Sequence, residues 1–130
     1  MSSPDNGAPR RRLSPRRRAQ RIRAVQYAVL IAVTGDDDSA DRIRSLSAGE
    51  PKLTARLVRE PTRTTTVKTR YIADGQQLLR ADEESTEPIR PETAEQIIKV
   101  LAEEIQAADA LVLSDYLKGV LTDDVLAAAI

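Results

Sequence analysis

The stretch VLIAV at residues 29–33 decides the fold that this sequence predicts. A short, unbroken apolar run of this kind is typical of a strand buried on both faces of a parallel sheet. The next residues, TGDDD at 34–38, break the run and offer acidic side chains to the start of a helix, where the helix dipole favours them. Apolar residues at helical spacing then predict a short amphipathic helix over residues 38–48, which Gly49 ends.

The rest of the chain repeats this alternation of strands and helices. Apolar and polar side chains alternate at residues 53–58, which predicts a second strand. Pro91 opens a longer helix, the run ALVL at 110–113 predicts another buried strand, and Thr122 caps a last helix. This order is typical of an α/β protein with a mostly parallel sheet and flanking helices. The apolar face of the longer helix consists of Ala94, Ile97, Ile98, Leu101, Ala102, Ile105 and Ala108.

Residues 66–72 and 76–82 predict a β-hairpin, with a turn at residues 73–75 that contains glycine. Alternation along the strands predicts which side chains share a face. In the first strand, one face holds Thr66, Lys68, Arg70 and Ile72, and the other face holds Val67, Thr69 and Tyr71. In the second strand, one face holds Gln77, Leu79 and Ala81, and the other face holds Gln76, Leu78, Arg80 and Asp82. Cations and amides on a small ribbon predict a polyhydroxylated, anionic ligand; the alternative is a charged face that keeps an exposed ribbon from aggregating.

A second group of polar residues, SDYLKG at 114–119, directly follows the predicted strand at 110–113. Ligands of open parallel sheets bind beyond the carboxyl ends of the strands. There Asp115 can accept hydrogen bonds from sugar hydroxyls, Lys118 can neutralise a phosphate, and Gly119 allows a close approach of the backbone. The alternative is a connecting loop whose charged side chains are merely solvated.

Composition limits the chemistry of the chain. Its 130 residues suffice for one domain or part of a larger one, and the absence of Cys and His excludes disulfides, thiolate sites and imidazole catalysis. The acidic run at 36–38 is explained by helix capping, so no metal site is expected. No apolar run approaches the length that spans a bilayer, and no secretory signal is evident, so we expect a soluble cytoplasmic protein without a membrane partner.

The net charge of zero hides two oppositely charged parts. Residues 1–34 contain eight arginines and one acidic residue, whereas residues 35–130 contain twelve cations and nineteen acidic residues. We expect residues 1–28 to form a basic, disordered tail. Such a tail can contact nucleic acid through counterion release, although a like-charge segment without a partner is the simpler interpretation.

Three segments in this order resemble one family. They are TTVKTR at 65–70, QQLLRAD at 76–82 and LSDYLKGVLT at 113–122, and VTGDD at 33–37 also fits. The chain is similar over residues 29–130 to the D-glycero-D-manno-heptose 7-phosphate kinases, which also form the kinase half of a bifunctional ADP-heptose synthesis protein. These kinases belong to the ribokinase-like (PfkB) carbohydrate kinases.

The resemblance implies a ribokinase-like α/β sandwich with a small β lid, at about residues 53–82, that also pairs two subunits. It implies phosphorylation of the 1-hydroxyl of heptose 7-phosphate with ATP and Mg²⁺, a step toward ADP-heptose for lipopolysaccharide. The lid residues that match are Thr66, Lys68, Arg70, Gln76, Gln77 and Arg80. The residues that match the loop at the sugar are Asp115, Tyr116 and Lys118.

The chain also departs from the family. A Gly-Gly-x-x-Asn segment that grips the sugar is missing before residue 29, and the nucleotide site and the turn with the catalytic base are expected beyond residue 130. We therefore expect residues 29–130 to be an incomplete kinase domain that is inactive and binds no ATP or Mg²⁺ by itself, with residues 1–28 read in a shifted frame. The alternative function is a non-enzymatic module that dimerises through the ribbon and contacts nucleic acid with its tail.

Overall fold

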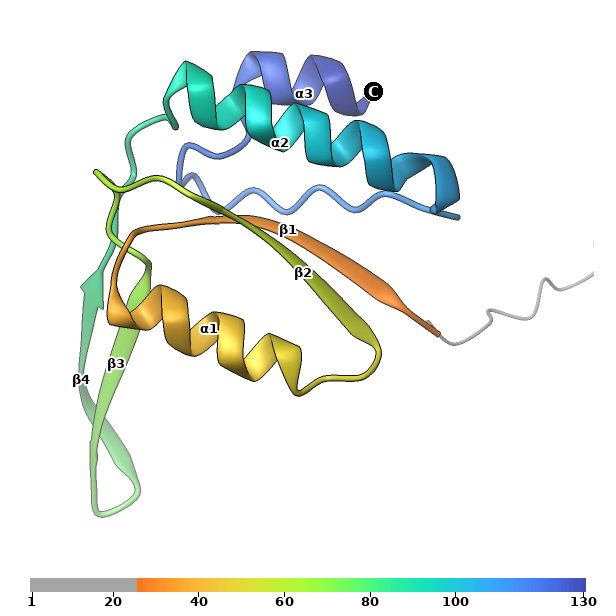
Figure 1. The fold of residues 1–130 in the computed structure, drawn as a ribbon. Helices are drawn as coiled ribbons and strands as arrows, with labels where there is room; N and C mark the ends of the chain where they lie inside the picture. The colour runs from red at the N-terminus through yellow and green to blue at the C-terminus, as the bar shows by residue number, and fades with distance from the viewer. Residues whose placement is uncertain (1–25) are drawn as a thin grey trace, which may run out of the picture.

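The computed structural model describes residues 26–130 and shows a small α/β fold with two two-stranded sheets (Figure 1). Residues 1–25 of the expected basic tail lie outside the described residues. No helix among residues 26–130 is long and apolar enough to cross a membrane. The elements are β1 (Ala28–Thr34), α1 (Asp38–Ala48), β2 (Leu53–Arg59), β3 (Val67–Ala73), β4 (Gln76–Glu83), α2 (Pro91–Glu104), a 3₁₀ turn (Ile105–Ala107) and α3 (Asp123–Ala129).

The β1–α1–β2 unit confirms the strand–helix–strand prediction. β1 and β2 pair in parallel, from Ala28 opposite Leu53 to Thr34 opposite Arg59. The helix begins where the acidic run predicts, because Asp37 Oδ1 accepts a hydrogen bond from the Ala40 amide at 2.9 Å. It ends at Gly49, whose amide donates to the Leu46 carbonyl at 3.2 Å.

Helices cover both faces of the parallel sheet. α1 lies on one side of β1 and β2, α2 lies on the other, and α3 packs against α2 (Figure 1). α2 buries Ala94, Ile97 and Leu101 of the apolar face predicted for the long helix. Ala102 and Ala108 of that face are exposed, and the α-helix gives way to a 3₁₀ turn at Ile105. The buried core lies between α2, α3 and β2 and consists of Val58, Ile89, Ala94, Ile97 and Val125.

Two strand predictions are corrected by the structure. The start of β1 is not buried on both faces, because Val29 and Leu30 are exposed at the end of a sheet that has only two strands among the described residues. The apolar run at 110–113 forms no strand: it is exposed, with Val112 84% accessible, and has no ladder partner in residues 26–130. An apolar run predicts burial, but a strand exists only where a neighbour supplies hydrogen bonds.

The predicted hairpin is present as β3 and β4, and it projects away from the rest of the fold (Figure 1). Asp74 (φ +50°) and Gly75 (φ +76°) form its two-residue turn, as the positive φ values of a type I′ turn require. A register shift between Tyr71 and Ile72 places Gln77 opposite Ile72. The predicted alternation therefore fails toward the tip. Residues 53–59, included in the lid expected at 53–82, pair with β1 and not with the hairpin.

Candidate functional site: the junction of the hairpin and the 114–119 loop

Hydrogen bonds between backbone amides and side chains join the end of β1 to the residues that precede β3. The Gly35 amide donates to Thr65 Oγ1 at 2.8 Å, and the Thr65 amide donates to Asp37 Oδ2 at 2.9 Å. Gly35 has no room for a side chain, because a Cβ there would collide with the Arg63 carbonyl. The hydrogen bonds from the Thr65 and Ala40 amides lower the pKa of Asp37. The residues before the hairpin are thereby fixed to the start of α1.

A buried ion pair follows β2. Glu60 Oε1 lies 3.6 Å from Arg63 Nη1, and both side chains are only 6% exposed. Glu60 Oε2 also accepts the Arg90 amide at 3.0 Å, at the start of α2. Burial by itself would raise the pKa of Glu60, but hydrogen bonds from Thr93 and Arg90 and the charge of Arg63 together lower it. Glu60 is therefore an ionised, structural carboxylate.

Arg63 holds the 114–119 loop to the two segments that flank the hairpin, residues 60–66 and 84–87, which we call the hairpin stem. Its guanidinium donates to the Glu87 carbonyl at 2.9 and 3.0 Å, to the Ser85 carbonyl at 3.5 Å, and to the Lys118 carbonyl. Gly119, at φ +71°, packs so closely on the backbone of Glu87 that a Cβ would collide with it. The close approach predicted for Gly119 therefore occurs, and its partner is the protein's own backbone.

Charged side chains from the hairpin and the loop meet in one cluster, which we call the lid–loop cluster. Its members are Lys68, Arg80, Asp82, Glu84 and Lys118. Lys68 Nζ lies 2.7 Å from Asp82 Oδ2 and 3.3 Å from Glu84 Oε2, and Arg80 Nε lies 2.9 Å from Asp82 Oδ1. Lys118 pairs with Glu84 through the other carboxylate oxygen. The cluster thus joins residues 68–84 to Lys118, which lies 34 residues beyond Glu84 along the chain.

The pKa values of the lid–loop cluster reflect these pairs. The hydrogen bond from Lys118 is the main cause that lowers the pKa of Glu84, and that from Lys68 is the main cause that lowers the pKa of Asp82. The pKa of Lys68 is raised, chiefly by its hydrogen bond to Asp82. All three groups are therefore charged at neutral pH.

The other predicted site residues lie around this cluster or away from it. Arg70 lies directly opposite Arg80 in the hairpin, while Gln76 and Gln77 lie at its tip. Gln77 pairs with Ile72, which lies four residues from Lys68 along β3, a distance of roughly 13 Å. The structure therefore brings together Lys68, Arg80 and Lys118, and leaves both glutamines distant. Thr66 is exposed just before β3.

The 114–119 loop shows local strain. Asp115 Oδ1 accepts a hydrogen bond from the Leu117 amide at 2.7 Å, so part of the capacity of this carboxylate to accept hydrogen bonds is used within its own loop. Leu117 has φ +56°, a left-handed conformation that is unfavourable for a residue with a Cβ. The Tyr116 side chain is 79% exposed. Strained backbone of this kind is concentrated at functional sites.

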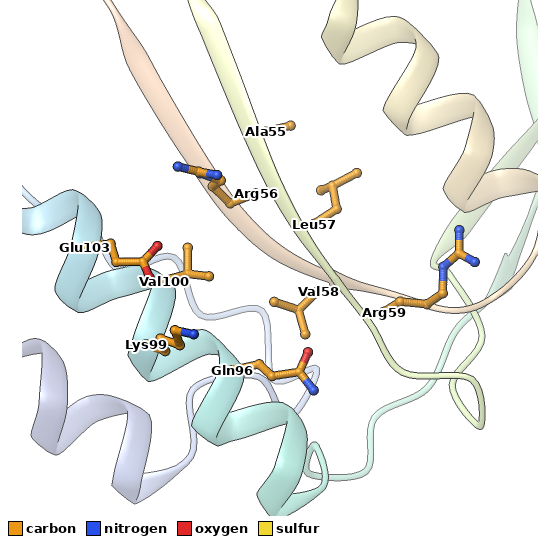
Figure 2. Close-up of a pocket in the computed structure, with 9 residues that line it drawn as sticks. All are labelled: Ala55, Arg56, Leu57, Val58, Arg59, Gln96, Lys99, Val100 and Glu103. Atoms are coloured by element: carbon orange, nitrogen blue, oxygen red, sulfur yellow. The ribbon is translucent and has the colours of Figure 1, made fainter.

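Two open concavities lie elsewhere on the described surface. One, of about 570 Å³, lies between the start of α1 and the hairpin stem and is lined by Asp36, Asp37, Asp38, Ser39, Arg63, Thr64, Thr65, Val67 and Glu83. Figure 2 shows the other, of about 470 Å³, with residues of β2 on one side and residues of α2 on the other. Neither is lined by a predicted site residue. The acidic lining of the first does not suit an anionic ligand.

Sequence reasoning missed Glu60, Arg63, Thr65 and Glu84. Glu60, Arg63 and Thr65 lie just after β2, at the sheet edge where ligands of parallel sheets bind, and that position was the available signal. Glu84 lies in an acidic connector that gave no signal, because a run of acidic residues is ordinarily a solvated segment.

No family model matches this chain. Curated relatives do: it is 42% identical over 100 residues to the bifunctional protein HldE of Hyphomonas neptunium, covering 77% of this chain and 21% of that protein. It is 44% identical over 103 residues to HldE of Gluconacetobacter diazotrophicus, covering 79% and 21%. For HldE of Acidiphilium cryptum the identity is 43% over 94 residues, covering 72% and 19%. The chain is thus homologous to a segment of HldE proteins and spans about a fifth of their length.

Proposed function

We propose that this chain corresponds to the kinase half of HldE proteins and is the part of a ribokinase-like heptose 7-phosphate kinase that binds the sugar phosphate. Homology to HldE supports the link to ADP-heptose synthesis. The segments TTVKTR, QQLLRAD and LSDYLKGVLT, which resemble the heptose kinases, support the choice of the kinase half. The observation that carries the proposal is that Lys68 of the hairpin and Lys118 of the 114–119 loop, 50 residues apart along the chain, both contact the Glu84 carboxylate.

In this proposal the 7-phosphate lies between the ammonium groups of Lys68 and Lys118. A phosphate is well suited to two point charges that approach it from different segments. Arg70 and Arg80 add to the same positive potential. They lie directly opposite each other in the hairpin, and such a pair of like charges is unfavourable until an anion lies between them. The Asp115 carboxylate can accept hydrogen bonds from sugar hydroxyls, and the Thr66 hydroxyl can either accept or donate them.

We assign no ATP or Mg²⁺ site to the described residues. Among residues 26–130, no group of three acidic side chains converges on one point. The sequence also has no glycine-rich phosphate loop of the usual patterns. The part of the reaction that we assign to this chain is therefore to bind and orient the sugar phosphate.

Binding can be tested directly on the 130-residue chain. Titration with heptose 7-phosphate, followed by calorimetry, should give saturable binding that Lys68→Gln and Lys118→Gln each weaken about ten-fold, as for the loss of one charged hydrogen bond. Lys99→Gln, which changes an exposed lysine of α2 outside the lid–loop cluster, is the matched control and should leave the affinity unchanged. Equal affinities of all four proteins, or no binding, would refute the assignment.

The choice of the kinase half can be tested in a relative. In HldE of Hyphomonas neptunium, the segment that matches residues 67–83 should be replaced by a short Gly-Ser linker. We expect loss of ATP-dependent phosphorylation of heptose 7-phosphate, while transfer of an adenylyl group to heptose 1-phosphate is retained. Loss of the adenylyl transfer alone would place the match in the other half of the protein.

We further propose that the hairpin pairs two copies of the chain. Its second face carries Tyr71 and Leu79, which lie directly opposite each other and are both more than half exposed. An exposed apolar face on a two-stranded ribbon is unfavourable in water, and pairing with a second copy would cover it.

A further inference from the structure

One carboxylate in the lid–loop cluster has a distinct position. Among the described residues, Glu84 is the acidic side chain that contacts both Lys68 and Lys118, one with each of its oxygen atoms. It lies one residue beyond the end of β4 and outside the paired register of the hairpin. The two lysines assigned to the sugar phosphate are therefore already neutralised by a group of the protein itself.

The charges of the cluster do not allow a phosphate to be added without rearrangement. Its three cations face two carboxylates, Asp82 and Glu84. A dianionic phosphate placed between Lys68 and Lys118 would lie next to the Glu84 carboxylate, and like charges at such a separation repel strongly. Either the phosphate does not bind between the two lysines, or the Glu84 side chain moves away from them.

We propose that Glu84 is an internal counter-ion that occupies the phosphate position and is displaced by phosphomonoester dianions. This inference rests on the proposed function and adds a rule of selectivity to it. A dianion can replace Glu84 because it offers more charge to the two lysines than one carboxylate does. A neutral sugar cannot, and so the cluster admits phosphorylated sugars and rejects free ones.

The structure around Glu84 is suited to this exchange. The side chain is 21% exposed, so it has a path to solvent. The backbone of the 114–119 loop is held independently, by the hydrogen bond from Arg63 to the Lys118 carbonyl and by the bond from the Ile89 amide to the Gly119 carbonyl at 2.9 Å. Release of Glu84 would therefore free the lysines without releasing the loop.

The test uses the whole 130-residue chain and inorganic phosphate at pH 7.5 as the dianionic probe, with dissociation constants from NMR shifts of the amides of Lys68 and Lys118. Glu84→Gln should tighten phosphate binding about three- to ten-fold, the range expected for removal of two partly exposed ion pairs. Glu83→Gln makes the same change in net charge at a neighbouring residue without an ion pair in the described part of the chain, and should change the affinity less than two-fold. Mannose should bind neither protein.

The outcomes separate this inference from the proposed function. If the wild type binds phosphate, Lys68→Gln weakens it, and Glu84→Gln binds no more tightly than Glu83→Gln, the counter-ion role is wrong and the binding site stands. If neither the wild type nor Glu84→Gln binds phosphate, both proposals are wrong. Mannose binding by either protein refutes the selectivity. Glu84→Asp keeps the charge but is too short to reach both lysines, so its affinity should fall between those of the wild type and Glu84→Gln.

Discussion

The guanidinium of Arg63 donates a hydrogen bond to the backbone carbonyl of Lys118, 55 residues further along the chain. This bond links the end of the parallel sheet to the loop that carries a candidate phosphate-binding lysine. Because the same guanidinium also binds the carbonyls of the hairpin stem, one buried side chain sets the position of the hairpin relative to the loop. We therefore expect the stability of the fold and the geometry of the lid–loop cluster to depend on each other through Arg63.

Arg63→Met should destabilise the fold by about 3 kcal/mol, because it leaves the buried Glu60 charge and several carbonyls without their partner. The free energy of unfolding from urea titration measures the effect. Arg44→Met is the control: Arg44 forms an exposed ion pair with Asp41 on α1, and its loss should cost less than about 0.5 kcal/mol. Equal costs for the two variants would show that the buried network contributes little.

Gly119→Ala should destabilise the protein by about 3 kcal/mol, since the left-handed conformation is unfavourable for alanine and the new Cβ would collide with the Glu87 backbone. Gly75→Ala provides a matched comparison. Gly75 has a similar φ but open space around it, so its replacement should cost only about 1 kcal/mol, from the backbone conformation alone. Thermal unfolding of both variants tests the difference, and a smaller loss for Gly119→Ala would contradict the observed packing.

Acid should destabilise the fold because several carboxyl groups have lowered pKa values. The pKa is lowered in Asp37 and Asp82 from 3.8, and in Glu60 and Glu84 from 4.5. Each group binds protons more readily in the unfolded chain, so its stabilisation is complete above these ordinary values and is lost as the pH falls through the lower pKa of the folded state. The urea midpoint should therefore be constant from pH 7 to about 5.5 and fall steeply below about 4.5.

The contribution of Asp37 to this pH dependence can be isolated. Asp37→Asn removes the charge and keeps an acceptor oxygen for only one of the two amides, because those of Ala40 and Thr65 bind different carboxylate oxygens. At pH 7 its urea midpoint should be below that of the wild type. The gap should narrow as the pH falls below 3.8, because the Asp37 carboxyl then binds protons in the unfolded wild type and, at a still lower pH, in the folded wild type as well. A gap that widens in acid would reverse the assigned sign.

Leu79→Ser should weaken the self-association that we propose for the hairpin, because it places a hydroxyl on the exposed apolar face opposite Tyr71. Sedimentation velocity over a range of concentrations measures the change. Leu46→Ser is the control, since Leu46 is also more than half exposed but lies on α1. A monomeric wild type, or the same shift for both variants, would exclude the hairpin as the interface.

Local sequence signals were enough to predict several elements. Asp37 and Gly49 define the ends of α1 because capping depends on residues within one turn of the helix. The hairpin turn was predictable because Asp74 and Gly75 tolerate positive φ. The predicted strand at 110–113 was wrong, because its pattern reports apolar character and not whether a hydrogen-bonding neighbour is present.

The candidate site was predictable only in part. Lys68, Arg80 and Lys118 stood out as cations on a ribbon and at a strand end, and the structure places them in one cluster. The carboxylate between them was not predictable, since Glu84 belongs to an acidic connector whose neighbours in space are distant in sequence. The register shift near Tyr71 likewise has no local signal, and it places Gln77 opposite Ile72.

By itself, the sequence determined the caps, the turn, the apolar face of α2 and the positions of the cations, because each of these depends on residues a few positions apart. Only the tertiary structure decided that Arg63 clamps the loop and that Glu84 lies between Lys68 and Lys118. Those contacts join residues 16 to 55 positions apart. They arise from the packing of the whole chain, which brings buried carbonyls and charges to whichever partner can satisfy them.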